Sequence, residues 1–195
     1  LEVVGEAQDG RQAVAMTLKL KPAVVLMDIA MPLLNGLEAT RQIHTAQPAT
    51  RVLILSAHGD DAYVNNSSEC GASGFVIKQT SSHEVCQAIR LVASGQTFFS
   101  PSVGQRIDRL KKLSSQKRGN PRLEKLTARE VEVLQLIAEG KANKETAAIL
   151  GIGIKTVEKH REHLMSKLDI HDTAGLTRYA IGAGIIESRV QLTIL

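Results

Sequence analysis

Residues Asn143–Leu168 read NKETAAILGIGIKTVEKHREHLMSKL and predict two short helices joined by a glycine turn. Apolar residues gather on one side of the first helix, and Gly151 then interrupts the helical pattern. Apolar residues recur at helical spacing in the second helix as well. The buried sides are expected to hold Ala147, Ala148 and Leu150 in the first helix and Val157, Leu164 and Leu168 in the second.

The other side of the second helix is polar and mixed in charge. A helix with such a side fits the major groove of DNA, where it reaches phosphates and base edges. A helical hairpin with a solvated outer face shows the same periodicity, so periodicity alone leaves both interpretations open. The polar residues are Lys155, Lys159, Glu162 and Ser166, flanked by Thr156, His160 and Arg161.

Three of these positions allow alternatives. The carboxylates of Glu158 and Glu162 repel phosphates, so we expect them either to pair with neighbouring cations or to accept from a cytosine amino group. The cations within reach are Lys155, Lys159 and His163. His160 fits a DNA contact and an ordinary partly buried histidine equally well.

The region from Leu126 to Leu168 resembles the LuxR/NarL-type helix-turn-helix domain. The resemblance implies a homodimer bound to double-stranded DNA, and a last helix, begun by Asp172 or Thr173, that supplies either the dimer contact or intradomain packing. The matching residues are Leu126-Thr127-Ala128-Arg129-Glu130, Val133-Leu134, Gly140, Asn143-Lys144-Glu145, Thr156-Val157, His160 and Lys167-Leu168. The implied DNA-binding residues are Asn143, Lys144, Lys155, Thr156, Lys159, His160 and Arg161.

Charge divides the chain into two halves. Residues 1–100 carry 7 Lys/Arg and 9 Asp/Glu, a net charge of −2, whereas residues 101–195 carry 17 and 11, a net charge of +6. This asymmetry predicts that only the C-terminal half meets a polyanion. Two cysteines, Cys70 and Cys86, and the lack of a long apolar run predict a cytoplasmic protein without a membrane span.

The N-terminal half alternates between apolar runs and helical patterns. Repeated units of this kind predict an open α/β sheet with right-handed crossovers. We expect strands at 1–5, 23–27, 51–55 and 74–77, and helices before Pro22 and at about 36–46, 60–70 and 82–94.

Three polar residues directly follow apolar strands in this half: Asp28, Ser56 and Lys78. The carboxyl ends of parallel strands meet at one edge of a sheet, where functional groups gather. A carboxylate can attack a phosphoryl group, while an ammonium and a hydroxyl bind the phosphoryl oxygens. We therefore predict Asp28 as a phosphoryl acceptor, Lys78 as its counter-charge and Ser56 as the sensor of the modification.

This half resembles the receiver domain of two-component response regulators, and the whole chain resembles the NarL/FixJ type. The resemblance implies a doubly wound, flavodoxin-like receiver of five strands, phosphorylated by a sensor histidine kinase. It further implies Mg²⁺ held by Asp28 and the carbonyl of Ala30, and inward movement of Phe75, which otherwise fits an ordinary core residue. The matching residues are Met27-Asp28-Ile29-Ala30-Met31-Pro32, Gly36, Leu55-Ser56-Ala57 and Gly74-Phe75-Val76-Ile77-Lys78.

The expected organisation is a receiver at 1–98, a linker with a possible helix at 99–122, and an all-α DNA-binding domain at 123–195. Because the family's first, central strand and its acidic pair do not precede Leu1, we expect the receiver to be N-terminally incomplete. Mg²⁺ should therefore bind weakly. Residues 1–20 should be misplaced, loosely packed or paired with another molecule.

Two alternatives compete with a phosphorylated transcription factor. One is an atypical regulator whose receiver acts only as a dimerisation platform. The other is an enzyme, a phosphatase of the haloacid-dehalogenase kind. That enzyme needs a second Asp two residues after the nucleophile, where this chain has Ala30, so we predict no enzymatic turnover.

Overall fold

The computed structural model describes residues 1–57, 67, 69–99 and 126–186. The chain divides into two compact units, Leu1–Leu123 and Glu124–Leu195. The helix expected at 60–70 lies largely outside the described residues, and so does the linker with its possible helix expected at 99–122. No helix within the described ranges is long and apolar enough to cross a lipid bilayer.

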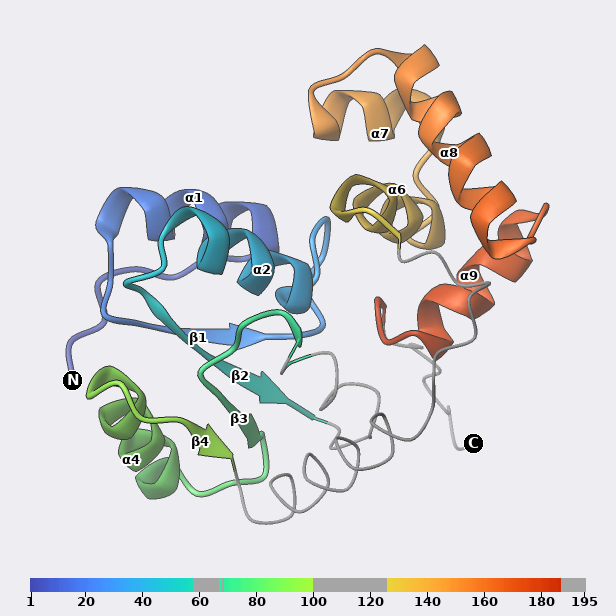
Figure 1. The fold of residues 1–195 in the computed structure, drawn as a ribbon. Coiled ribbons are helices and arrows are strands. Elements are labelled where there is room, and N and C mark those ends of the chain that lie inside the picture. Colours follow the sequence, from blue (N-terminus) through green and yellow to red (C-terminus); the bar gives the residue numbers. More distant parts are fainter. Residues whose placement is uncertain (58–66, 68, 100–125, 187–195) are drawn as a thin grey trace, which may run out of the picture. The chain divides into compact units, whose positions relative to one another are not determined.

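The first unit is a parallel sheet covered by helices on both faces, as the sequence predicted. Helices α1 and α2 lie on one face and α4 on the other (Figure 1). Alternate strand residues point to opposite faces, so Met27, Ile54 and Phe75 share one apolar core. Leu53 and Val76 join a second core with α4. The described elements are α1 (Gly10–Leu20), β1 (Val24–Asp28), α2 (Gly36–Ala46), β2 (Arg51–Ser56), β3 (Gly74–Ile77), α4 (Ser82–Ala93) and β4 (Phe98–Phe99), with strand order β1-β2-β3-β4.

The N-terminal segment differs from the prediction. Residues 1–5 form no strand, because an extended segment needs a hydrogen-bonded neighbour and no described strand pairs with them. Residues 1–8 are exposed, in accord with the expected loose packing. Helix α1 was expected to be loose too, but it packs against α2 and buries Ala13 and Thr17.

The sheet also gains a strand that we had placed at the receiver's boundary. Phe98 and Phe99 pair with Gly74 and Phe75 as the short strand β4. Two residues are too few to show an alternating pattern, so no local pattern predicts this strand. In the described residues the sheet has four strands rather than the family's five.

The second unit is a cluster of four described helices: α6 (Ala128–Ala138), α7 (Asn143–Leu150), α8 (Ile154–Leu168) and α9 (Thr173–Gly182). Helix α6 contacts α8 and α9, and α7 packs on α8. Val157 and Leu164 of α8 are fully buried, whereas Leu168 is half-buried and Ala148 is exposed, contrary to our expectation. Helix α9 thus packs within the domain, capped by Asp172.

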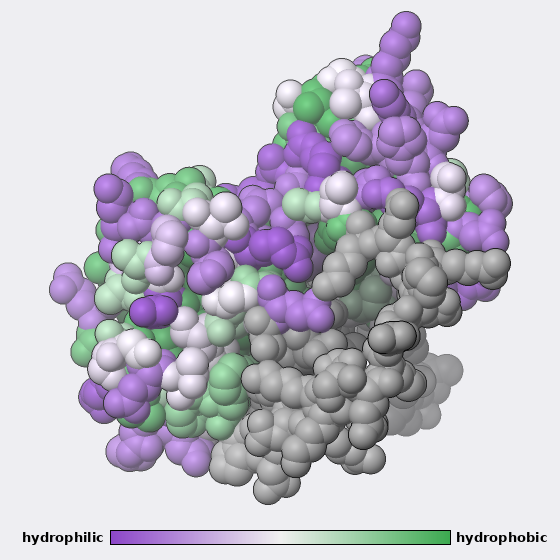
Figure 2. All heavy atoms as spheres, in the orientation of Figure 1, coloured by the Kyte–Doolittle hydropathy of each residue, from purple (hydrophilic) through white to green (hydrophobic). Residues whose placement is uncertain are grey.

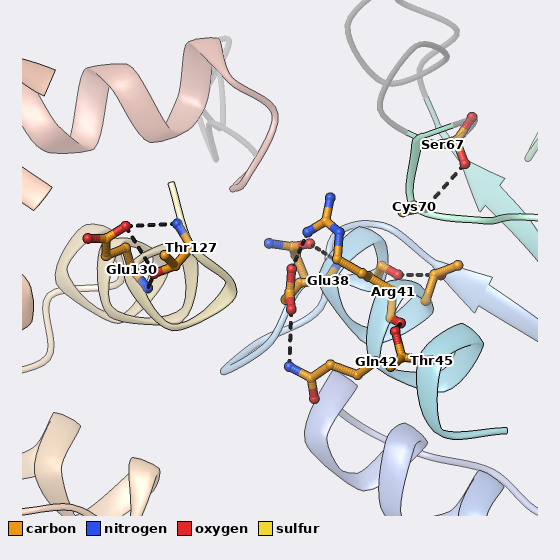
Figure 3. Close-up of polar contacts among 11 residues, drawn as sticks. Glu38, Arg41, Gln42, Thr45, Ser67, Cys70, Thr127 and Glu130 are labelled. Carbon is orange, nitrogen blue, oxygen red and sulfur yellow. Dashed lines mark hydrogen bonds and ion pairs between the residues drawn. The ribbon is translucent and has the colours of Figure 1, made fainter. Parts of the chain in front are cut away.

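A buried carboxylate joins α6 to α8. The Thr127 amide and hydroxyl donate to Glu130 Oε2 at 2.8 and 3.0 Å (Figure 3). The Lys167 ammonium donates to the same oxygen at 3.0 Å. Burial alone would raise the pKa of Glu130, but the hydrogen bonds from Thr127 and Lys167 outweigh it and hold this pKa below its usual value of 4.5. The charged carboxylate therefore stabilises the helix cluster.

Replacing Glu130 with glutamine is expected to cost about 1–3 kcal/mol at pH 7, because the Lys167 ammonium loses its charged acceptor. The stabilisation by the Glu130 carboxylate is complete above pH 4.5, the pKa of the group in the unfolded chain. It is lost as pH falls through the lower pKa of Glu130 in the folded protein. Urea unfolding between pH 3 and 7 measures it, with Asp169→Asn as the control because the side chain of Asp169 is exposed. Equal pH dependence in Glu130→Gln and the parent would contradict this assignment.

Candidate functional site

The carboxyl ends of three strands come together in the first unit. Asp28 ends β1 opposite Leu55 of β2, and Ser56 ends β2 opposite Ile77 of β3. The amide of Lys78 donates to the Ser56 carbonyl at 2.8 Å, which extends the β2–β3 ladder by one residue. The parallel register thus places Asp28, Ser56 and Lys78 at one edge of the sheet.

Asp28 and Lys78 are in direct contact, although fifty positions separate them in sequence. The Lys78 Nζ lies 2.7 Å from Asp28 Oδ2 in a charge-assisted hydrogen bond. The side chain of Asp28 is 35% exposed and that of Lys78 is 43% exposed. A reagent can therefore reach the carboxylate. The pair is an accessible carboxylate with an adjacent cation.

The loop after Asp28 is held at both ends by glycines. Gly36 donates its amide to the Ile29 carbonyl at 2.9 Å, and a Cβ added at Gly36 would lie 1.9 Å from the Asp28 carbonyl oxygen. A Cβ at Gly10 of α1 would lie 2.0 Å from the Leu34 carbonyl oxygen. Backbone thus packs against backbone at both positions, which fixes the loop beside the carboxylate.

The other two predicted receiver residues are buried. Ser56 is 1% exposed, and Phe75 is fully buried in the core shared with Met27 and Ile54. Phe75 already lies inside in this structure. This position fits the core interpretation, and the inward movement of Phe75 stays a prediction.

The predicted Mg²⁺ ligands do not form a complete site by themselves. Magnesium prefers six oxygen ligands, and Asp28 with the carbonyl of Ala30 would supply one carboxylate and one carbonyl. One oxygen of Asp28 already binds Lys78. Within the described residues no cluster of three acidic, histidine or cysteine side chains is placed to hold a metal ion.

The second unit presents the polar side of α8 to solvent. The surface over α8 is mostly hydrophilic (Figure 2). Gly151 adopts φ 64° and ends α7, and Gly153 caps α8 with extended backbone but without a side-chain hydrogen bond. Of the predicted DNA-binding residues, Lys144, Lys155, Thr156 and Lys159 are exposed, whereas Asn143, His160 and Arg161 are half-buried.

Arg161 is engaged inside the domain. Its guanidinium donates to Asn143 Oδ1 at 3.4 Å and to Thr173 Oγ1 at 2.8 Å. Asn143 and Thr173 are the first residues of α7 and α9, so one side chain of α8 links the starts of two other helices. Both Asn143 and Arg161 therefore make contacts that a phosphate would have to replace.

The two halves of the chain match known domains separately. Residues 1–90 match the response regulator receiver domain, and residues 124–180 match the luxR family of bacterial regulatory proteins. The chain is 40% identical to the transcriptional regulatory protein MctR of Rhizobium johnstonii over 95% of this chain and 84% of MctR. It belongs to the LuxR-family response regulators. Response regulator protein VraR of Staphylococcus aureus is 36% identical over 96% of this chain and 87% of its own.

Solved structures of response regulators align with most of this chain. RcsB of Salmonella enterica serovar Typhimurium, bound to the promoter rprA with the phosphomimetic BeF₃⁻, aligns with a TM-score of 0.56 and 26% identity over 91% of this chain and 84% of RcsB. Another structure, of two RcsB dimers bound to two parallel DNAs, aligns with a TM-score of 0.50 and 25% identity. The alignment again covers 91% of this chain and 84% of RcsB. The chain is thus a two-component response regulator and transcription factor with a LuxR-type DNA-binding domain.

Two features of this response regulator escaped sequence reasoning. Arg129 donates to the Leu150 carbonyl at 2.9 Å, so a side chain of α6 caps the end of α7. Gly10 packs against a loop 24 positions later, and no local pattern marks that contact. A glycine directly after an N-cap aspartate is a weak signal that could have drawn attention to Gly10.

Proposed function

We propose that this response regulator controls transcription through phosphorylation of Asp28, with a sensor histidine kinase as the phosphoryl donor. The observation that carries the proposal is the contact of 2.7 Å between Lys78 Nζ and Asp28 Oδ2 at the carboxyl edge of the sheet. Such a pair suits transfer to a carboxylate, because the lysine neutralises charge on the incoming phosphoryl group.

In this reaction an oxygen of Asp28 forms a bond to phosphorus while the bond from phosphorus to the donor's histidine nitrogen breaks. The nitrogen keeps the electron pair and takes up a proton. Lys78 then exchanges its contact with the carboxylate for contacts with phosphoryl oxygens. In this proposal Ser56, at the end of β2, donates its hydroxyl to the same group, and Phe75 supports Ser56 from the core.

Phosphorylation would act on the DNA-binding domain by shifting a population between two arrangements. We assign DNA contacts to the exposed Lys144, Lys155, Thr156 and Lys159, and further contacts to Asn143, His160 and Arg161. RcsB binds DNA as dimers, which supports a homodimer on double-stranded DNA here. We propose no turnover of small substrates, because Ala30 stands where an acid/base aspartate would be needed.

The intact mass of the chain tests the proposal. After incubation with Mg²⁺ and a small phosphoryl donor, the parent is expected to gain one phosphoryl group and Asp28→Asn none, because an amide cannot serve as the nucleophile. Asp169→Asn, the same change at an exposed residue of the other unit, should gain one as well. A parent without any gain would favour the alternative, a phosphorylation-independent regulator whose receiver serves as a dimerisation platform.

A further inference from the structure

Two carboxylates lie on the polar, exposed side of α8. Glu158 and Glu162 are exposed and one helical turn apart, on the side that also carries Lys155 and Lys159. Like charges four positions apart destabilise a helix slightly, and carboxylates also repel the phosphates of DNA. The helix thus carries two groups that are unfavourable for both its own stability and general DNA affinity.

Neither carboxylate is neutralised within the described part of the chain. None of the ion pairs identified among the described residues involves Glu158 or Glu162. Arg161, three positions after Glu158, donates to Asn143 and Thr173 instead. In this structure neither carboxylate therefore makes the first of the two alternatives that the sequence left open, pairing with Lys155, Lys159 or His163.

The carboxylates instead line an open groove beside α8. The groove is bounded by Glu158, Arg161, Glu162, Met165, Ser166 and His171. Arg161 lies between Glu158 and Glu162 in this lining. Its guanidinium is held by hydrogen bonds to Asn143 of α7 and Thr173 of α9, so this part of the groove is fixed in place. Both acceptors are therefore presented on a rigid helix with open space in front of them.

We propose that Glu158 and Glu162 determine sequence specificity by accepting hydrogen bonds from the amino groups of cytosines in the major groove. This proposal rests on the DNA-binding function. An ionised carboxylate is an acceptor only. Guanine shows only acceptors in the major groove, thymine an acceptor and a methyl group, and adenine an amino donor beside the acceptor N7, whereas cytosine shows a donor alone.

The same groups would discriminate against other sites. Where the facing base shows only acceptors or a methyl group, the carboxylate loses its water without gaining a donor and still repels the backbone. Affinity for DNA without the preferred base is then lowered, while affinity for the preferred sequence is maintained. A repulsive group produces specificity through this difference in affinity. The two glutamates thus lower affinity for DNA in general and select among sequences.

Selection from a pool of random DNA duplexes tests the proposal, using the whole chain after treatment with a small phosphoryl donor. Glu158→Gln and Glu162→Gln keep the shape and helix propensity while adding a donor. Each variant is expected to lose a cytosine preference of about tenfold at one position and to favour adenine there, because an amide pairs with adenine. Binding of both variants to unrelated DNA should rise severalfold at constant salt.

Asp169→Asn is the matched control, since it removes one exposed negative charge from the same domain outside α8. It should enrich the same sequence motif as the parent. If Glu158→Gln and Glu162→Gln also enrich the parent's motif, the proposal is overturned while the DNA-binding function stands. If the parent enriches no motif, sequence-specific binding itself is absent and the proposal fails with it.

Discussion

The Gly36→Ala variant is expected to lose most of its phosphoryl incorporation. An alanine Cβ at this position would lie 1.9 Å from the carbonyl oxygen of Asp28 and 3.0 Å from Met27 Cγ. Neither neighbour is the free end of a flexible side chain, so the backbone of Asp28 has to move by about an ångström to reach ordinary contact distance. A carboxylate moved that far no longer matches Lys78 and Ser56, and misplacement of this size can cost about a hundredfold in rate.

The same substitution should destabilise the receiver by about 1–3 kcal/mol, the usual cost of overpacking. Loss of phosphorylation must therefore be separated from partial unfolding. Gly10→Ala provides the comparison, because its Cβ would meet the Leu34 carbonyl oxygen at 2.0 Å, at the far end of the same loop. It should cost similar stability but retain more phosphorylation than Gly36→Ala. Urea unfolding and the time course of phosphoryl gain by mass measure the two effects.

Gly182→Ala is the control without a clash, since nothing lies within 4 Å of its added Cβ. Because Gly182 is the last residue of α9, the substitution should change stability little and leave phosphorylation unchanged. Parent-like phosphorylation in Gly36→Ala would show that the position of the Asp28 backbone does not limit transfer. The role assigned to Gly36 would then be wrong.

The strand-end residues were predictable because they depend on a rule of topology. Once the apolar runs are assigned to parallel strands, their carboxyl ends must share an edge. Asp28 and Lys78 therefore meet, although they are far apart in sequence. The resemblance to response regulators added their chemical roles, which no spacing in the sequence specifies.

The remaining differences between prediction and structure arise from contacts with distant parts of the chain, which the sequence of one segment does not reveal. Residues 1–5 have the composition of a strand, but a strand forms only where a neighbour offers hydrogen bonds. The guanidinium of Arg161 lies on the edge of a helical face that was predicted correctly. Its partners, however, come from the starts of α7 and α9, whose packing is a tertiary property. A helical pattern predicts which side is buried, but not where a long side chain ends.

Charge on α8 should govern both the strength and the selectivity of DNA binding. Lys155 and Lys159 are exposed and one turn apart near the start of the helix, where a helix enters the major groove. A lysine that contacts only a phosphate contributes equally on every sequence, whereas one that reaches a base edge contributes only on the correct sequence. We assign the phosphate to Lys155 and a base edge to Lys159.

Lys155→Ala is therefore expected to weaken binding to all sequences and to lower the slope of log affinity against log salt by about 1. Lys159→Ala should in addition relax the base preference at one position, at a cost of about 1–3 kcal/mol on the preferred site. Lys19→Ala, which removes a charge from α1 of the receiver, should change neither quantity. Affinities for preferred and unrelated duplexes over a range of salt measure all three variants. If both α8 variants bind DNA with the parent's affinity, another surface of the domain contacts DNA. Removing a lysine that neutralises a phosphate must change the number of counterions released on binding, and therefore the affinity.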